Sequence, residues 1–203
     1  MEFGDVVRRR KMVRTFQSSP VDPLILERIL RHGQRAPSAG YSQGFEFLLL
    51  EGPDETGRFW EAATVDEPVL EGVRAAPVIV IPFASKDVYL DRYAEEDKRW
   101  EDRDESRWPV PYWYVDAAFA SMLMLLSAVN EGLGALFFGL HPPTTRRVKL
   151  TFGVPDGWDP IGAIAIGHPA EKDPVRSSVH TRPRKPFEEV VHRGRWRRSG
   201  HQS

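Results

Sequence analysis

The spacing of hydrophobic residues predicts alternating helices and strands over most of the chain. Short apolar runs between turn signals predict strands at residues 45–51, 78–83, 135–139 and 161–167. Helical spacing of apolar residues predicts helices at residues 2–10, 22–35, 54–63, 114–131 and 144–152. Because helices separate the strands, the pattern indicates an α+β or α/β fold.

Three segments depart from this alternation. Residues 114–131 are apolar on every side, which predicts a buried central helix that ends at Gly132 and Gly134. Residues 86–105 are polar on nearly every side and predict an exposed helix, whereas residues 108–113 are rich in Pro and aromatic residues and predict irregular structure. Residues 169–203 contain many Pro and Arg and few apolar residues, so we expect an arm that lies against another surface, such as a second subunit.

Composition narrows the classes of protein. The chain has 203 residues, enough for one domain with a sizeable core or for two small ones, and its 41% apolar and 28% charged residues are typical of a globular protein. A net charge of −1 argues against a general attraction to nucleic acid or to membranes. The absence of cysteine excludes disulfides, a thiolate nucleophile and a zinc ribbon. The start of the chain has no apolar leader segment, so we expect a cytoplasmic protein.

Three separate segments have the chemistry of a phosphate site. Residues 8–14 carry five basic groups and no acid, the turn at residues 36–43 is rich in small residues, and Arg182 and Arg184 flank Pro183. Guanidinium groups bind oxyanions in a bidentate manner and stay charged, which suits a phosphate monoester. Each segment has an ordinary alternative, namely a solvated helix face, a helix-ending turn and a basic tail.

Residues 132–139 form the fourth candidate segment. The strand that follows the two glycines is either a core strand or one whose backbone N–H groups and aromatic rings line a flat ligand such as a flavin. The six histidines show no spacing typical of metal ligands, and the chain lacks a Gly-x-Ser-x-Gly elbow, a Gly-x-Gly-x-x-Gly fingerprint and a Walker loop.

Taken in order, these segments resemble the FMN-dependent nitroreductase family. The likeness rests on Arg10…Arg14-Thr15-Phe16, Arg35-Ala36-Pro37-Ser38-Ala39-Gly40-x-x-Gln43, Glu131-Gly132-Leu133-Gly134, Ile161–Pro169 and Arg182–Val190, and it runs from about residue 5 to residue 196. The resemblance implies a single α+β domain over residues 1–203, with a central, mostly antiparallel sheet flanked by helices. It also implies a homodimer in which each C-terminal arm is exchanged and two FMN molecules lie at the interface.

The resemblance also implies site residues. The FMN phosphate and pyrimidine edge would be held by Arg10, Lys11, Met12 and Arg14, with Arg14 as the electrostatic stabiliser of the reduced flavin. The partner would contribute Pro37, Ser38 and Ala39, the strand backbone would contribute Leu136, Phe137, Phe138 and Gly139, and Arg182 and Arg184 would close on the phosphate. Substrate contacts are expected from Tyr41 and from Trp108 and Trp113 of a variable lid at about residues 86–113.

Three features depart from the family pattern. Met12 replaces a small hydroxyl residue, so only its backbone is expected to bind. Tyr41 stands where members often have Asn, and the glutamate that some members carry near flavin N5 is missing from residues 136–139. The choice of substrate is therefore the property that transfers least well.

The resulting hypothesis is a ping-pong NAD(P)H oxidoreductase that reduces a nitroaromatic, a quinone or a similar small acceptor through FMN N5, with no metal. NADH, NADPH and a deazaflavin remain alternative donors. Two further hypotheses keep the flavin, namely an enzyme that acts on the flavin itself or on another specialised substrate, and a non-catalytic FMN-binding protein. Nucleic-acid binding through the two basic ends is disfavoured by the near-neutral net charge.

Overall fold

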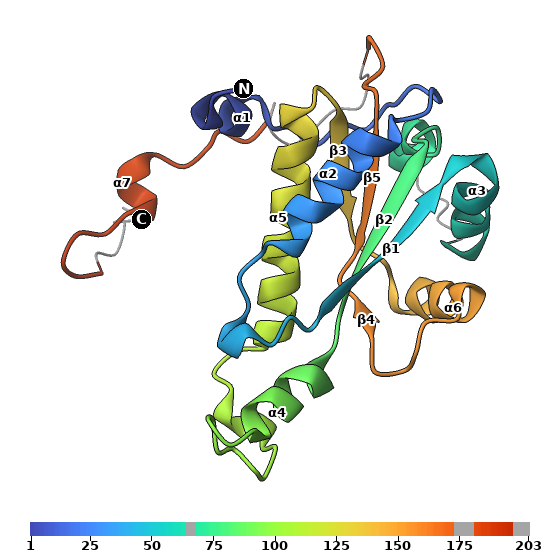
Figure 1. Cartoon of the computed structure of the whole chain (residues 1–203). Coiled ribbons are helices and arrows are strands. Elements are labelled where there is room, and N and C mark those ends of the chain that lie inside the picture. Colours follow the sequence, from blue (N-terminus) through green and yellow to red (C-terminus); the bar gives the residue numbers. More distant parts are fainter. Residues whose placement is uncertain (64–67, 173–180, 197–203) are drawn as a thin grey trace. The chain divides into compact units, whose positions relative to one another are not determined.

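The computed structural model describes residues 1–63, 68–172 and 181–196 (Figure 1). Contacts divide the chain into two units, Met1–Asp173 and Pro174–Ser203. The first unit contains the sheet and its flanking helices. In the described part of the second unit, the regular element is a short helix, α7 (Phe187–Val190), which the sequence pattern did not predict.

An antiparallel sheet forms the centre of the first unit. The strands β1 (Phe45–Glu51), β2 (Val78–Ala84), β5 (Ala163–Gly167) and β3 (Gly134–Phe138) follow one another in that order, and every neighbouring pair is antiparallel. A short strand, β4 (Asp159–Pro160), also pairs with β2. The α+β class, the antiparallel sheet and the four strands predicted from sequence are therefore confirmed.

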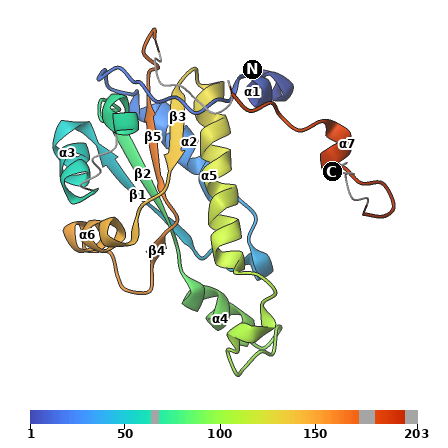
Figure 2. The same cartoon turned by 180° about the vertical axis from the view of Figure 1, so that it is seen from behind.

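Helices cover both faces of this sheet (Figures 1 and 2). One face carries α2 (Pro23–Gln34) and α5 (Tyr112–Asn130), and the other carries α3 (Gly52–Ala63) and α6 (Pro142–Phe152). Alternate residues of β2 therefore enter different cores, with Val80 packed in the cluster of α2 and α5 and Ile81 in the cluster of α3 and α6. Burial on both faces explains why β2 and β5 are continuously apolar.

Local signals set the helix ends. Asp22 accepts a hydrogen bond from the Leu24 N–H at 2.8 Å and Pro23 opens the first turn, so α2 begins where the sequence predicted. Gly153 ends α6 in a left-handed conformation with a φ of 66°. The shorter elements are α1 (Phe3–Arg9), η1 (Ala39–Tyr41), η2 (Pro68–Val73) and η3 (Glu105–Arg107).

The prediction of an exposed helix over residues 86–105 is only partly correct. The helix α4 (Lys86–Ala94) ends after nine residues, and the chain then folds back on it. Ion pairs hold the returning segment, because Arg103 contacts Asp91 at 2.7 Å and Lys86 contacts Glu105 at 2.8 Å. The charged residues that suggested one long solvated helix instead form ion pairs, and these attach the loop that follows α4 to this short helix.

The prediction that α5 is buried on all sides is wrong. Phe119 and Met122 are 48% and 45% exposed, and Tyr114 is exposed as well. These residues recur at helical spacing, with Ala118 between them, and form an apolar stripe that the described residues leave exposed. By length and composition α5 would also pass for a membrane span, yet half of the window that passes is buried inside the protein.

An ion pair between α2 and the end of α5 gives a prediction on pH. Arg28 donates two hydrogen bonds to Glu131, at 2.8 and 3.3 Å, and this contact holds the Glu131 pKa below its usual value of 4.5. Because the folded pKa is lowered, the stabilisation is present above about pH 4.5 and is lost as pH falls through the folded pKa. Arg28→Gln should lower the melting temperature at pH 7, and the difference from wild type should shrink under acid conditions.

Thermal unfolding followed by circular dichroism from neutral to acid pH tests this. Arg31→Gln is the matched control, because Arg31 pairs with Glu27 on the same helix and both side chains are largely exposed. A difference for Arg28→Gln that stayed constant across the pH range would contradict the assignment.

Candidate functional site

The basic N-terminal segment lies beside β3. Met12 forms a parallel bridge with Ala135, and the Val13 N–H donates to the Ala135 carbonyl at 3.1 Å. Further along, the Gln17 N–H donates to the His168 carbonyl at 2.9 Å. The structure therefore places residues 12 and 13 of the basic segment beside Ala135, the residue that precedes the predicted site residues 136–139.

A basic hollow of about 190 Å³ opens beside the start of β3, lined by Lys11 and Val13 but not by Arg10, Met12, Arg14 or residues 136–139. Arg9 and Lys11 line it together with the glycines that follow α5. Gly134 permits this close approach, because a Cβ there would lie 2.9 Å from the Val13 side chain. Within the described residues Arg9, Arg10 and Lys11 have no carboxylate partner, whereas Arg14 donates to the Met12 carbonyl at 3.2 Å. Cations without a carboxylate partner around a hollow suit an anionic ligand.

Most side chains of β3 pack in the hydrophobic core. Leu136 and Phe138 are buried, and the Phe138 ring stacks on Trp60 with centroids 5.7 Å apart. Phe137 is partly exposed and Gly139 is exposed. A ligand beside this strand would therefore meet mainly backbone, which is the kind of contact that the sequence predicted.

The turn at residues 37–43 is attached to the start of α5 and to α4. The Ala39 N–H donates to Asp116 Oδ2 at 2.8 Å, and Arg92 Nε donates to the Gly40 carbonyl at 3.0 Å. Within the turn, the Gln43 N–H donates to Ser38 Oγ at 2.9 Å. The bonds to Asp116 and Arg92 hold backbone atoms of the turn, and the third engages the Ser38 side chain.

The predicted substrate residue Tyr41 projects from this turn. It has a φ of 57° and is 76% exposed, and Gln43 has a φ of 53°. Positive φ is costly for residues with a Cβ and is found mostly at functional sites. Its exposure leaves Tyr41 available to a ligand, and its role in binding stays a prediction.

The lid tryptophans lie in an aromatic cluster. Trp108 contacts Tyr93 and Trp100 with ring centroids 4.5 and 5.4 Å apart, and Trp113 packs beside Tyr89. Trp113, in the first turn of α5, is only 4% exposed, and its contact with substrate stays a prediction. Trp108 is partly buried, and its role stays a prediction.

The two halves of the predicted site lie at opposite ends of α5 (Figure 2). Asp116, in the first turns of the helix, holds the turn, while Ala135, just beyond its end, pairs with the basic segment. A helix of 19 residues is roughly 28 Å long. One chain therefore does not bring Pro37, Ser38 and Ala39 to Arg10–Arg14.

Arg182 and Arg184 are exposed residues of the second unit, and their convergence on a phosphate stays a prediction.

Sequence reasoning missed the residues that hold the turn. Asp116 is the one acid within the apolar sequence of residues 112–130, a signal that could have identified it. Arg92 gave no such signal, because it lies among the many charged residues of the lid.

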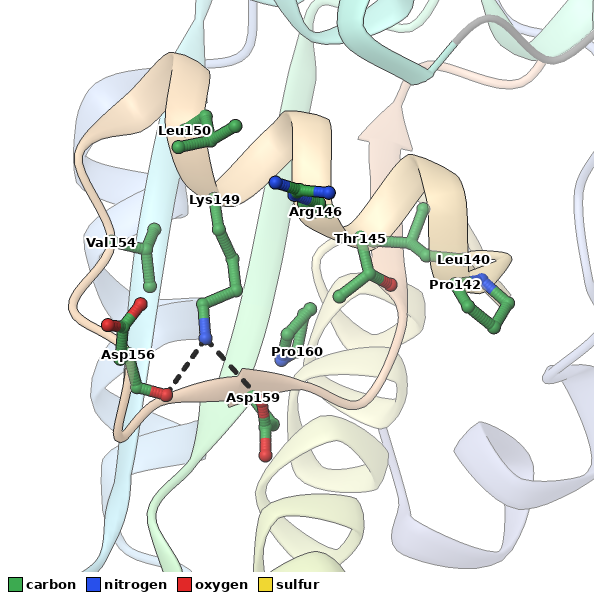
Figure 3. Close-up of a pocket in the computed structure, with 10 residues that line it drawn as sticks. All are labelled: Leu140, Pro142, Thr145, Arg146, Lys149, Leu150, Val154, Asp156, Asp159 and Pro160. Carbon is green, nitrogen blue, oxygen red and sulfur yellow. Dashed lines mark hydrogen bonds and ion pairs between the residues drawn. The ribbon is translucent and has the colours of Figure 1, made fainter.

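The most voluminous of the described hollows is elsewhere. It measures about 580 Å³ and lies between α6 and the segment that contains β4, on the opposite face of the sheet (Figure 3). Lys149 crosses it, donating to the Asp156 carbonyl at 3.0 Å and pairing with Asp159 at 3.5 Å. Because no predicted site residue lines it, its volume does not identify the site.

Comparison with known proteins decides the family. The model of the nitroreductase family matches residues 7–168. The chain belongs to this family. It is 25% identical over 179 residues to a Methanothermobacter thermautotrophicus protein assigned as an NADH dehydrogenase/NAD(P)H nitroreductase, covering 87% of this chain and 82% of that protein. It is 23% identical over 205 residues to an NADPH-dependent oxidoreductase of Staphylococcus aureus, covering 95% and 73%.

Solved structures share the fold of this family member. A nitroreductase family protein from Streptococcus pneumoniae aligns with a TM-score of 0.71 and 19% identity, covering 94% of this chain and 99% of that one. This likeness supports the fold alone. The contacts described above are what support the candidate site.

The turn gives a prediction on stability. Gly40 has a φ of 61°, and a Cβ there would lie 2.6 Å from the Tyr93 ring. Gly40→Ala should therefore destabilise the protein by about 1–2 kcal/mol, through backbone strain and displacement of the ring.

Chemical denaturation measures the change, with Gly57→Ala as the control. Gly57 lies within α3 with open space around it, so Ala there should stabilise by about 0.5–1 kcal/mol through helix propensity. A Gly40→Ala variant as stable as wild type would show that the turn is less constrained than the structure indicates.

Proposed function

We propose that this nitroreductase family member is an FMN-dependent NAD(P)H oxidoreductase that works as a homodimer and reduces a small acceptor such as a nitroaromatic or a quinone. Membership of the family and the names of the two relatives support an oxidoreductase that uses NAD(P)H. The observation that carries the proposal is the basic hollow at the start of β3, where Arg9 and Lys11, which pair with no carboxylate of the described residues, lie beside strand backbone.

The residues present fit FMN. Lys11 and Arg9 line the hollow and suit a phosphate, with Arg10 proposed as a further ligand from the same segment. The Met12 backbone lies beside Ala135, and the β3 backbone from there to Gly139 is the proposed edge for the ring. Bound FMN would supply hydride transfer through its N5. Arg14, partly buried and fixed by its bond to the Met12 carbonyl, would favour negative charge near the ring. Arg182 and Arg184 remain proposed further phosphate ligands.

The dimer is proposed because one chain carries two separated half-sites. If two copies of α5 pack antiparallel through the apolar stripe, a twofold axis places the turn of one copy beside the basic segment of the other. Pro37, Ser38 and Ala39 would then reach the FMN of the partner, and Tyr41 and Trp108 would border the acceptor. Exposed Phe119 and Met122 give this stripe the apolar character of an interface core.

The first prediction concerns cofactor binding. The purified protein should take up FMN and show the visible absorption of a bound flavin, and NAD(P)H should bleach it until an acceptor is added. Arg10→Ala and Lys11→Ala should each weaken FMN binding about tenfold, through loss of a charge-assisted bond to phosphate.

Arg146→Ala is the charge-matched control, because Arg146 is exposed on α6 across the sheet. Failure to bind FMN would overturn the proposal. Tight FMN binding without oxidation of either nicotinamide would instead favour a non-catalytic flavin protein or one that acts on a specialised substrate.

The second prediction concerns assembly. Met122→Glu puts a charge in the middle of the apolar stripe and should convert a dimer into monomers that no longer retain FMN, because each half-site loses its complement. Leu150→Glu, on the exposed face of α6, should change neither property.

Sedimentation velocity with absorbance detection at flavin wavelengths reports assembly and cofactor together. A wild-type monomer that binds FMN, or a Met122→Glu monomer that retains it, would contradict the shared site.

A further inference from the structure

We infer that Asp116 and Arg92 are positioning residues that hold the turn at residues 37–43 in the shape in which it meets the flavin and the acceptor. The inference rests on the proposed function, in which this turn completes the site of the partner copy. It concerns residues that would not touch the cofactor and that the sequence motifs did not identify.

The backbone of the turn is strained. Gly40, Tyr41 and Gln43 have φ values of 61°, 57° and 53°, so two residues with a Cβ occupy the left-handed region within three positions. Such conformations are unfavourable for residues with a Cβ and persist only where the surroundings determine them. Bonds within the turn, such as the one from the Gln43 N–H to Ser38 Oγ, contribute to this shape, and Asp116 and Arg92 add two bonds from outside it.

Asp116 holds the amide side of the turn. Its Oδ2 accepts from the Ala39 N–H at 2.8 Å and from the Tyr89 hydroxyl at 2.7 Å, and the side chain is 3% exposed. Hydrogen bonds to a carboxylate away from water are stronger than neutral ones. Burial, followed by the bond to Asp116, raises the pKa of Tyr89, so its hydroxyl stays a donor that orients the carboxylate.

Arg92 holds the carbonyl side and connects the turn to the lid. Its Nε donates to the Gly40 carbonyl, while its terminal nitrogens bind Asp97 at 2.8 Å and Glu95 at 3.0 Å. One guanidinium therefore joins the turn to the segment that follows α4. If that segment moved, the planar guanidinium of Arg92 would transmit the displacement to the turn.

These two contacts give the turn a fixed relation to the proposed interface and to the lid. Asp116 belongs to α5, whose opposite face carries the apolar stripe, so the same rigid helix sets both the approach of the partner and the position of the turn. Tyr41 then projects from a fixed base. Loosening either contact should degrade flavin binding and acceptor use without removing any group that touches them.

The test on α5 compares Asp116→Ala, Asp116→Asn and Ser121→Ala. The Asn oxygen can take the place of Oδ2 and accept the same bonds, so it should rescue function. Ser121 is an equally buried polar residue of the same helix, and its hydroxyl donates only to the Ala117 carbonyl within that helix. It controls for general damage to α5.

Two properties are measured for each α5 variant, namely the Kd for FMN and the amide hydrogen exchange of residues 38–43 in the protein without added flavin. Asp116→Ala should weaken FMN binding about tenfold and speed exchange of the turn, Asp116→Asn should stay within about threefold of wild type, and Ser121→Ala should change neither.

The test on the lid compares Arg92→Met with Arg103→Met. Both remove a guanidinium that pairs with lid carboxylates, yet Arg92 contacts the turn and Arg103 contacts Asp87 and Asp91 of α4 instead. Arg92→Met should raise the KM for a quinone acceptor about threefold or more and speed turn exchange. Arg103→Met should leave both near wild type.

The outcomes separate this inference from the proposed function. A wild-type protein that binds no FMN overturns the proposed function, and the positioning role with it. A wild type that binds FMN, with turn exchange and FMN binding unchanged in Asp116→Ala, overturns the inference alone. If Asp116→Ala does not fold, the Arg92 and Arg103 pair decides, and equal effects of those two variants would show a general lid contribution instead of positioning.

Discussion

The rigidity of α5 is the constraint on which the account depends. The helix holds the small-residue turn at its beginning through Asp116 and is followed at its end by the strand that pairs with the basic segment. A helix of that length cannot bend its ends together, so the two groups of candidate ligands stay apart in one chain. The proposed twofold pairing of α5 would bring the two groups of ligands together from different copies of the chain. It would also cover the exposed apolar stripe, which accounts for the apolar character of that surface.

The turn at residues 37–43 and the lid are connected by direct contacts in the structure. Aromatic rings from α4, the lid loop and the start of α5 pack together. Arg92 joins the segment that follows α4, through Glu95 and Asp97, to the strained backbone of the turn. Substitutions in the lid would therefore affect more than the residues that line the proposed acceptor site. It would also shift the turn that the proposed dimer places against the flavin, which connects substrate choice to cofactor geometry.

Much of the fold could be predicted from the sequence, because periodicity and end signals report local structure. β1 occupies the predicted residues 45–51, and the Asp22 cap fixed the start of α2. The predictions failed where long-range contacts decide. Charge alone could not show that Arg103 folds the chain back on α4, and apolar content alone could not show that one face of α5 is uncovered. The burial of Trp113 is likewise set by long-range contacts, since its ring packs beside Tyr89 of α4 and Trp108 of the lid loop.

Subunit complementation tests the shared site most directly. One variant would carry Arg10→Glu with Lys11→Glu, and the other Gly40→Val, so that each damages a different half. Unfolding and refolding the two together should produce mixed dimers in which one site has both intact halves, and about a quarter of all sites should recover FMN. Each variant alone should stay nearly colourless. A mixture that binds no more FMN than the separate variants, at a normal yield of dimers, would contradict a site built from two copies of the chain.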